Sequence, residues 1–473
     1  MATRFFPHPL YPYKTLSYLP LRKGDANTPN KDYKASALFR RLLPIRIPVI
    51  YYGVMNIPDS VNLADEMEEQ IPHDLLEFIL KAGGLAQKRQ QRLYMVGGAV
   101  RDLLLERITL DIDLVIEGDA IKMAQELAPI NQAKVTLHSR FGTAKLQWRN
   151  RSADIATARA ETYAHPGALP AVKSGTLLED LARRDFTVNA MAIEVNPTHF
   201  GELIDLHNGL RDINKRLIRV LHNKSFTDDA TRIWRALRYE QRLDFNIEPV
   251  TLNLIKRDID RLDTISGDRI RHEMELVLKE ELPEKALQRA GELGVLAKIN
   301  PMLKGDDWLA ETFTAASERC IDGTPQPHLY LALLFYRLTT EETEKVISYL
   351  HLPKAAAQVL RDTAAIKSRT NELSLRSLAP SMVYEILHGY SLTAIEANTL
   401  GAGSETAAEH IELYMNVLRH VNPTLTAEDL LKLDVPEGPK IKEFLKRLRE
   451  ARLDGKIESR KDEEEMVRGW IGK

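Results

Sequence analysis

Two aspartates one residue apart are the side chains in this chain best suited to binding a metal ion. Asp111 and Asp113 occur in the sequence Asp-Ile-Asp, within a segment 111–116 whose pattern predicts a strand. Residues two apart in a strand point to the same face, so the two carboxylates would repel each other unless a cation lay between them. Mg²⁺ commonly binds one or two carboxylates together with substrate phosphates. The pair therefore predicts a Mg²⁺ site, although most isolated pairs of this kind are only solvated.

A glycine turn precedes this pair in the sequence. Gly97 and Gly98 follow a predicted strand at 93–96 and begin a predicted helix that carries Arg101. Glycines leave backbone N–H groups uncovered, and the start of a helix attracts anions. Together with the carboxylates, this turn predicts a triphosphate site, because phosphoryl transfer depends on positioning and charge neutralisation. The structural alternative is a turn needed only for packing, with Arg101 paired to Asp102.

Asp154 is a candidate third carboxylate or general base. It lies in a strand-like segment, 153–156, and a neighbouring strand could place it beside the aspartate pair. The alternative is a polar residue at the edge of a strand. The segment that follows, 157–175, contains prolines and glycines and is predicted to be a loop, either mobile or a plain connector.

A stripe of charged residues is predicted on a helix further along the chain. Asp229, Arg232, Arg235 and Arg238 recur at every third position. Three cations on one face require anions, which phosphates would supply. Arginine can also donate two hydrogen bonds to a base edge, whereas an ionised aspartate only accepts them. The stripe thus predicts a nucleotide-binding face, and a solvated helix with salt bridges is the alternative.

In their order and spacing, these motifs resemble those of the class II tRNA nucleotidyltransferase and bacterial poly(A) polymerase family. The matching segments are 97–102 with 111–113, then 183–190, then Asp205 with Gly209 and Asp212, then 228–232, and finally 268–273. Asp228 departs from the glutamate usual at its position but keeps a carboxylate. The resemblance covers about residues 75–300 and extends more loosely to the C-terminus.

The resemblance implies a nucleotide-binding set made of Gly98, Arg101, Arg184, Asp185, Asn189, Asp229, Arg232, Arg235 and Arg238. Asp229 and Arg232 would select the base of the incoming nucleotide by contacting its Watson–Crick edge, in place of a template. Arg235 and Arg238 would support the triphosphate.

The same resemblance also implies roles for the remaining motif residues. Arg184 would contact the nucleotide, and Asp185 with Asn189 would lie near the ribose. Arg269 and Glu273 are expected to brace helices rather than to contact substrate.

The activity implied by the resemblance is the template-independent addition of CMP, AMP or both from CTP and ATP to the 3′ end of tRNA. Asp111 and Asp113 would hold one Mg²⁺ ion for this reaction, a second Mg²⁺ would bridge the triphosphate, and Asp154 could assist. Addition of A only, addition of CC only and poly(A) synthesis share all of these motifs. A contrasting class is a noncatalytic RNA-binding protein, which would gain nothing from adjacent unneutralised carboxylates.

The expected fold is an α+β head with a polymerase β-like mixed sheet, followed by helical domains. With 473 residues the chain is too long for one core. No convincing strand is predicted after about residue 214, where amphipathic helices such as 341–350 and 354–367 begin. The predicted parts are a leader or disordered extension (1–54), a head (55–213), a neck for base recognition (214–280), a body (281–390) and a tail that contacts tRNA (391–473).

Composition sets limits on the kind of protein. The single cysteine, Cys320, excludes an internal disulfide framework and a multi-cysteine zinc site, and it is typical of a reducing compartment. Formal net charge is −2, so contact with RNA must come from a local basic face. The basic segment 435–457, which resembles the tail region of bacterial family members, is the candidate, and an ordinary amphipathic surface helix is the alternative. No segment approaches the length of a membrane span, and we expect a cytoplasmic protein. No pattern in the sequence indicates an oligomeric state.

Overall fold

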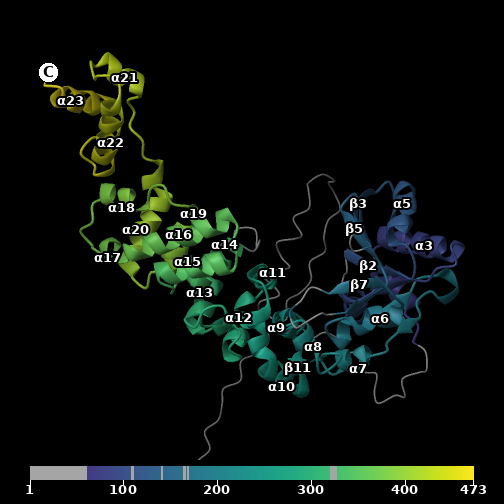
Figure 1. The fold of residues 1–473 in the computed structure, drawn as a ribbon. Coiled ribbons are helices and arrows are strands. Elements are labelled where there is room, and N and C mark those ends of the chain that lie inside the picture. Colours follow the sequence, from purple (N-terminus) through teal and green to yellow (C-terminus); the bar gives the residue numbers. More distant parts are fainter. Residues whose placement is uncertain are drawn as a thin grey trace, which may run out of the picture. The chain divides into compact units, whose positions relative to one another are not determined.

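The computed structural model describes residues 61–107, 111–139, 142–162, 167, 170–319 and 327–472. The predicted extension at 1–54 and Cys320 lie outside the described residues. Within them, a mixed sheet with helices is followed by a largely helical part (Figure 1), which confirms the predicted fold class. The division into neck, body and tail stays a prediction.

The head contains a seven-stranded sheet with the order β3-β4-β5-β2-β1-β8-β9. Its central pair, β2 and β5, is parallel, and the other neighbours are antiparallel. The strands are β1 (Leu93–Val96), β2 (Asp111–Ile116), β3 (Lys134–His138), β4 (Thr143–Trp148), β5 (Arg151–Thr157), β8 (Ala192–Glu194) and β9 (Leu203–Ile204). The strands predicted at 93–96 and 111–116 are confirmed.

Helices α3 (His73–Lys88) and α5 (Ala120–Asn131) pack on one face of this sheet. Phe78 of α3 stacks on Trp148 of β4 at 4.5 Å between ring centroids. Ile112 and Leu114 of β2 are buried on this side, as expected from their alternation with the aspartates. Asp119 caps α5 by accepting a hydrogen bond from the backbone N–H of Lys122 at 3.0 Å, as predicted.

The opposite face of the sheet is covered only in part. Tyr94, Val96 and Val115 form a small separate cluster with Leu177 and Leu181 of α6 (Leu177–Ala182). A capping box at Thr176 fixes the start of this helix. Because the aspartates of β2 alternate with the buried residues of that strand, they point to this same face.

The segment predicted as a loop at 157–175 contains a β-hairpin instead. Strands β6 (Arg159–Thr162) and β7 (Ala171–Ser174) pair antiparallel. The prediction was wrong because both strands are short and mostly polar, so they lack the apolar alternation that marks a strand. The prolines and glycine that suggested a loop, Pro166, Gly167 and Pro170, fall between the two strands.

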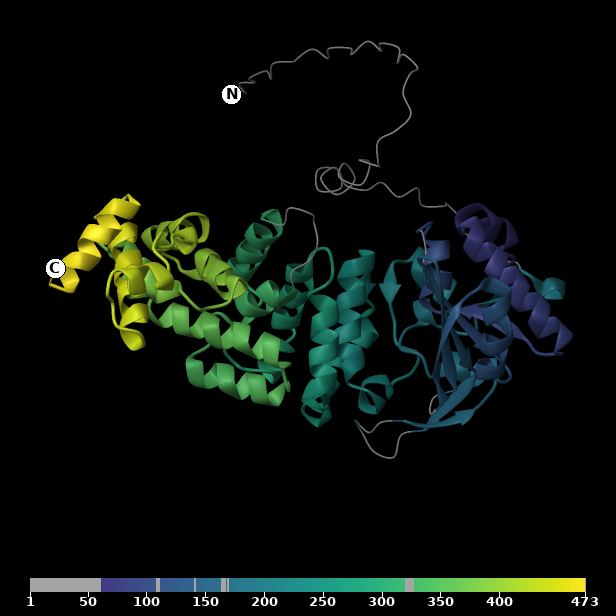
Figure 2. The ribbon, with the colours of Figure 1, turned by 90° about the horizontal axis from the view of Figure 1, so that it is seen from above.

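The second part of the chain is built from helices that pack side by side (Figure 2). The helices that matter for the site are α8 (Ser225–Asp228), α9 (Thr231–Leu243), α10 (Pro249–Asp258), α11 (Gly267–Val277) and α12 (Pro283–Glu292). A parallel pair of two-residue strands, β10 (Leu217–Ile218) and β11 (Asn246–Ile247), corrects the expectation of no strand after residue 214. Strands this short leave no periodic signal in a sequence.

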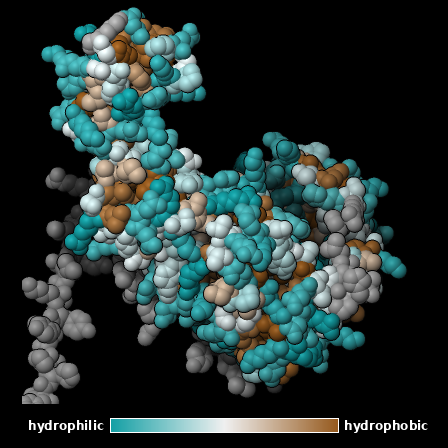
Figure 3. Space-filling view, turned by 60° about the vertical axis from the view of Figure 1, so that its left-hand side comes forward, coloured by the Kyte–Doolittle hydropathy of each residue, from teal (hydrophilic) through white to brown (hydrophobic). Residues whose placement is uncertain are grey.

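The helices predicted at 341–350 and 354–367 are confirmed as α15 (Thr340–Tyr349) and α16 (Lys354–Ser368). Near the C-terminus, α21 (Ala427–Lys432), α22 (Pro439–Leu453) and α23 (Arg460–Trp470) bury a hydrophobic cluster of their own. Hydrophilic side chains cover much of the molecular face seen in Figure 3. None of the described helices is long and apolar enough to cross a membrane.

Candidate active site

Three aspartates lie on two adjacent parallel strands of the head. Asp113 of β2 is paired in register with Asp154 of β5, and Asp111 is paired with Ser152. The Ser152 hydroxyl donates a hydrogen bond to Asp111 Oδ1 at 2.7 Å. Asp154 accepts one from the Lys145 ammonium at 3.3 Å. The structure therefore brings all three predicted carboxylates to one face of the sheet.

The electrostatics of this group favour a bound cation. Burial against the surrounding protein raises the pKa of Asp113 above its usual value, even though the side chain keeps contact with solvent. The charges of Asp154 and Asp111 raise this pKa further. The guanidinium of Arg184 and the ammonium of Lys145 oppose this shift. Carboxylate oxygens are the ligands that hard divalent cations prefer, so the residues present fit such an ion.

In the described residues, no group of three or more His, Cys, Asp or Glu side chains is arranged to hold a metal. Two carboxylates alone would leave most positions around a Mg²⁺ ion open. Those positions suit phosphate oxygens and water, which is the usual arrangement when the metal arrives with a nucleotide.

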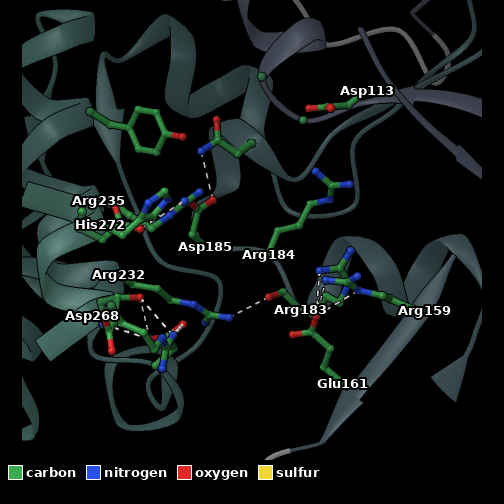
Figure 4. A pocket seen from close by; sticks show the side chains of 18 residues that line it. Asp113, Arg159, Glu161, Arg183, Arg184, Asp185, Arg232, Arg235, Asp268 and His272 are labelled. Carbon is green, nitrogen blue, oxygen red and sulfur yellow. Dashed lines mark hydrogen bonds and ion pairs between the residues drawn. The ribbon is translucent and has the colours of Figure 1, made fainter. Parts of the chain in front are cut away.

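A cavity of about 640 Å³ begins at Asp113 and extends between the head and helices α9 and α11. Its walls include the glycine turn, the 183–189 segment, Asp229 with Arg232, and α11 residues such as Arg269. Figure 4 shows Arg232 and the α11 residues Asp268 and His272 in this wall. The structure thus joins three motifs that lie far apart in the sequence. Most of the lining side chains are charged, which suits a charged and hydrogen-bonding ligand such as a nucleoside triphosphate.

The glycine turn and Arg184 fit closely together. Gly97 has a positive φ of 71°, and a Cβ at this position would lie 2.6 Å from Arg184 Nη1. Arg184 donates to Asp180 at 2.9 Å, while its Nε is buried with no hydrogen-bond partner in the described structure. In Figure 4 its guanidinium lies on the side of the cavity near Asp113. An unpartnered buried donor at this place suits an anionic ligand.

Arg101 pairs with Asp102, which is the structural alternative to a contact with the nucleotide. It is 3% exposed, donates to Asp102 at 2.9 Å, and donates to Asn189 Oδ1 at 2.5 Å. Asn189 in turn donates to Asp185. Arg101 is not among the residues that line the cavity. Its predicted contact with the nucleotide therefore has no support in this geometry.

Two arginines of the stripe, Arg235 and Arg238, pair with protein carboxylates. Arg235 donates to Asp185 from Nε at 2.8 Å and from Nη2 at 2.5 Å. Burial by itself would raise the pKa of Asp185, but Arg235 and hydrogen bonds from Asn189 and the Phe186 backbone lower it to about 2. Arg238 is buried, pairs with Glu280 at 3.3 Å and does not line the cavity.

Asp229 and Arg232 both line the cavity and are both held by neighbours. Asp229 lies just before α9 rather than on it, where Oδ1 accepts from the backbone and hydroxyl of Thr231 at 3.0 and 2.7 Å. Arg269 donates to Asp229 Oδ2 at 2.7 Å. Arg232 donates to the Ser225 hydroxyl at 2.8 Å and to the carbonyl of Arg183 at 2.7 Å.

Several lining residues were not singled out from the sequence. Arg159 and Glu161 of β6 belong to the segment predicted as a loop, and Glu161 accepts from Arg183 at 3.1 Å. His272 and Tyr239 also line the cavity. A segment predicted as a loop has no periodicity that would assign its charged side chains to one face. Their place in the cavity wall is therefore visible only in the structure.

In the tail, the basic run of α22 is largely engaged within the protein. Lys446 pairs with Glu385 at 3.0 Å, Arg452 pairs with Glu463 at 3.2 Å, and the Arg447 guanidinium lies over the Trp470 ring at 4.0 Å. Lys446 is nevertheless 57% exposed, and Lys440 and Lys442 of this helix are exposed as well.

A glycine turn, adjacent carboxylates and a polar cavity against a helical domain define a site for nucleotidyl transfer. Comparisons with known proteins agree. Residues 93–219 match the family model of the poly A polymerase head domain, and residues 244–306 match a model described as a probable RNA and SrmB-binding site of polymerase A.

Similar proteins extend over most of the chain. It is 31% identical to an A-adding tRNA nucleotidyltransferase of Halalkalibacterium halodurans, covering 87% of this chain and 96% of that protein. It is 33% identical to one from Geobacter sulfurreducens, over 88% of this chain but only 49% of that protein, so it spans about half of that relative's length. A CC-adding tRNA nucleotidyltransferase of Deinococcus radiodurans is 30% identical, with 88% and 98% covered.

Solved structures show the same likeness. The Thermotoga maritima CCA-adding enzyme complexed with tRNA has a TM-score of 0.71 and 29% identity, covering 88% of this chain and all of that one. A CCA-adding enzyme in complex with ATP has a TM-score of 0.74, with 88% of this chain and all of that chain covered.

The chain therefore belongs to the class II tRNA nucleotidyltransferase family. It is an enzyme of this type, and the alternative of a noncatalytic RNA-binding protein is not supported. Nucleotidyltransferases of this family generally use a divalent metal ion.

Proposed function

We propose that this protein adds nucleotides from CTP or ATP to the 3′ end of tRNA without a nucleic-acid template. The observation that carries this proposal is that Asp113 and the pair Asp229 and Arg232 line one cavity. A single cavity lined by a proposed metal-binding carboxylate, by a hydrogen-bond acceptor and by a hydrogen-bond donor suits both the selection of a nucleotide and its transfer. Relatives that act on tRNA support the acceptor.

We propose further that the nucleotide added is AMP, onto tRNA ending in CC. Two relatives named for A addition, at 31% and 33% identity, support this specificity. The second candidate is CC addition, which the Deinococcus relative supports at 30% identity over nearly its whole length. Addition of the complete CCA end shares the same motifs and is tested by the same experiment.

Base selection in this proposal depends on hydrogen bonds already made by the selecting residues. Thr231 and Arg269 fix the Asp229 carboxylate, and Arg232 is fixed by Ser225 and a backbone carbonyl. An arginine has five N–H donors, so donors remain beyond those two contacts. A rigid acceptor beside a rigid donor can discriminate between base edges because the wrong base leaves buried polar groups unpaired.

The residues that would hold Mg²⁺ are Asp111 and Asp113, in a two-metal arrangement. When bound, the metal would lower the pKa of the RNA 3′-hydroxyl and neutralise charge on the triphosphate. The 3′-oxygen forms a bond to the α-phosphorus, the bond to the bridging oxygen breaks, and pyrophosphate leaves. Asp154, in register with Asp113, is our candidate to accept the hydroxyl proton or to serve as a third carboxylate.

The test offers the purified protein three tRNAs that end at the discriminator base, in C and in CC, with CTP, ATP or both. We expect extension by one nucleotide only with the CC-ending tRNA and ATP. Extension of the other tRNAs with CTP would assign CC or CCA addition instead. No extension of any tRNA would overturn the proposed function.

A further inference from the structure

The sheet face that carries the aspartate pair continues as a polar surface across three more strands. Directly opposed residues in neighbouring strands share a face, so Asp113, Asp154, Lys145 and Thr136 form one row across β2, β5, β4 and β3. The hydrophobic cluster under α6 packs on β1, β2 and β8 of this face. Helices α3 and α5 pack on the other face.

Side chains on this part of the sheet are open to solvent. Asp154 is 49% exposed and Lys145 is 37% exposed. Beyond them, the β3 residues Lys134, Thr136 and His138 are exposed. A polar, open surface therefore lies directly beside the metal-binding carboxylates.

The nucleotide cavity stops where this surface begins. Asp113 lines the cavity, whereas Asp111, Asp154 and Lys145 are not among its lining residues. In phosphoryl transfer the attacking and leaving oxygens lie roughly in line, on opposite sides of the phosphorus. If the nucleotide and its pyrophosphate occupy the cavity, the acceptor must approach from the side of β5 and β4.

An RNA end approaching from that side meets three carboxylates, which would repel its phosphates. Lys145 supplies positive charge in this row, and it stands one strand beyond Asp154. Its ammonium has three donors, and Asp154 accepts one of them at 3.3 Å. Arg151 of β5 points to the helical face, where it pairs with Asp74 at 2.9 Å, and so does not serve this surface.

We propose that Lys145 binds a backbone phosphate at the 3′ end of the acceptor RNA and so positions the terminal hydroxyl beside Asp113. The proposal rests on the proposed function, because it assigns the acceptor side of the same reaction. Lys145 is a positioning residue that acts on the RNA backbone, and its contact carries no base specificity.

The experiment measures the affinity of the full chain for two RNAs at several salt concentrations: a tRNA ending in CC, and the same tRNA without its single-stranded 3′ end. The variants are Lys145→Ala, Lys145→Arg and, as a matched control, Lys81→Ala. Lys81 is 40% exposed and pairs with Glu77 at 2.8 Å, but it lies on α3, which packs on the opposite face of the sheet.

For the CC-ending tRNA we expect Lys145→Ala to weaken binding about tenfold, the effect of losing about 1.4 kcal/mol. The slope of log affinity against log salt should decrease by about one, as for a lost phosphate contact. The shortened tRNA should bind Lys145→Ala and the unchanged protein equally. Lys145→Arg should restore most of the affinity. Lys81→Ala should leave the affinity for both RNAs unchanged.

Equal loss for both RNAs would overturn the proposal, because it would indicate a structural effect. If Lys145→Ala causes no loss of affinity in the Asp154→Asn background, the proposal is also overturned, since the lysine would then only mask Asp154. Binding that is unchanged in Lys145→Ala, while the unchanged protein extends the tRNA, would refute this inference and leave the proposed function intact.

Discussion

Asp113, a proposed metal ligand, lies where its negative charge is unfavourable to the metal-free protein. Its pKa is raised, so the ionised form is disfavoured in the folded state until a cation arrives. A raised pKa of an acid means that stability falls as the pH rises through that pKa. Function and stability are therefore opposed at this residue.

Asp113→Asn should raise the melting temperature of the metal-free protein at pH 7. The reason is that the amide removes a charge that burial disfavours and that Asp154 and Asp111 repel, without losing much volume. The difference from the unchanged protein should shrink as the pH falls below the raised pKa of Asp113, and it should vanish once the pH is below the ordinary aspartate pKa, where the carboxyl is neutral in both the folded and the unfolded state. Thermal unfolding at a series of pH values measures this, and a lower melting temperature at pH 7 would contradict the assignment.

Asp185 shows the reverse behaviour. Its pKa is lowered to about 2, so it contributes stability that is present above the ordinary aspartate pKa and lost as the pH falls toward 2. Asp185→Asn should therefore lower the free energy of unfolding at pH 7 by about 2 kcal/mol and flatten its dependence on acid pH. Urea unfolding measures both effects.

Asp244→Asn is the control for this prediction. Asp244 is 91% exposed and pairs with Arg216 at 3.3 Å, and an exposed pair contributes little. Asparagine also tolerates its positive φ of 57°. An equal loss in both variants would show that the Arg235 pair does not stabilise Asp185.

Among the elements, the strand, glycine turn and helix at 93–104 were predictable because apolar periodicity and glycine coincide there. The pair Arg101–Asp102 was one of the two predicted arrangements, but the contact of Arg101 with Asn189 was not predictable, since the two residues lie far apart in the sequence. For the same reason, the arginine stripe was recognised on α9 while its partners Asp185 and Glu280 were not. Sequence shows which charges exist, and only the fold shows which of them neutralise each other.

The glycine turn gives a prediction at this scale. Gly97→Ala should cost about 1–2 kcal/mol of stability, because an alanine at positive φ is strained. Its Cβ would also press on the Arg184 guanidinium, so nucleotide affinity should fall as well. Chemical unfolding and titration with ATP report the two effects separately.

Gly84→Ala is the matched glycine control. Gly84 lies within α3, and a Cβ there would meet no atom within 4 Å. Alanine favours a helix by about 1 kcal/mol over glycine, so this variant should gain stability and keep its nucleotide affinity. Unchanged nucleotide affinity in Gly97→Ala would remove the turn from the binding site.

For the whole molecule, the sequence predicted the order of an α+β head and helical parts, because sheet and helix periodicities separate along the chain. It could not predict the hairpin at 159–174, whose strands are short and polar. It also could not show that much of the basic run in α22 is used inside the protein. Both features depend on contacts between distant segments.

Contact of the tail with tRNA is tested by comparing lysines on one helix. Replacing Lys440 and Lys442 together by alanine should weaken tRNA binding and lower its salt dependence, because both are exposed. Lys446→Ala should cost less than half the binding free energy lost in the double variant, because Glu385 at 3.0 Å partly neutralises Lys446, although Lys446 is itself 57% exposed. An equal loss per lysine, measured by binding at several salt concentrations, would speak against the assignment of Lys440 and Lys442 to RNA.

The central claim is that Asp111 and Asp113 hold the metal that activates nucleotide transfer to RNA. Its most direct test is incorporation of labelled AMP into CC-ending tRNA by the double variant Asp111→Ala and Asp113→Ala, with tRNA affinity measured on the same preparation. We predict no detectable incorporation and unimpaired tRNA binding. Turnover comparable to that of the unchanged protein would contradict the account.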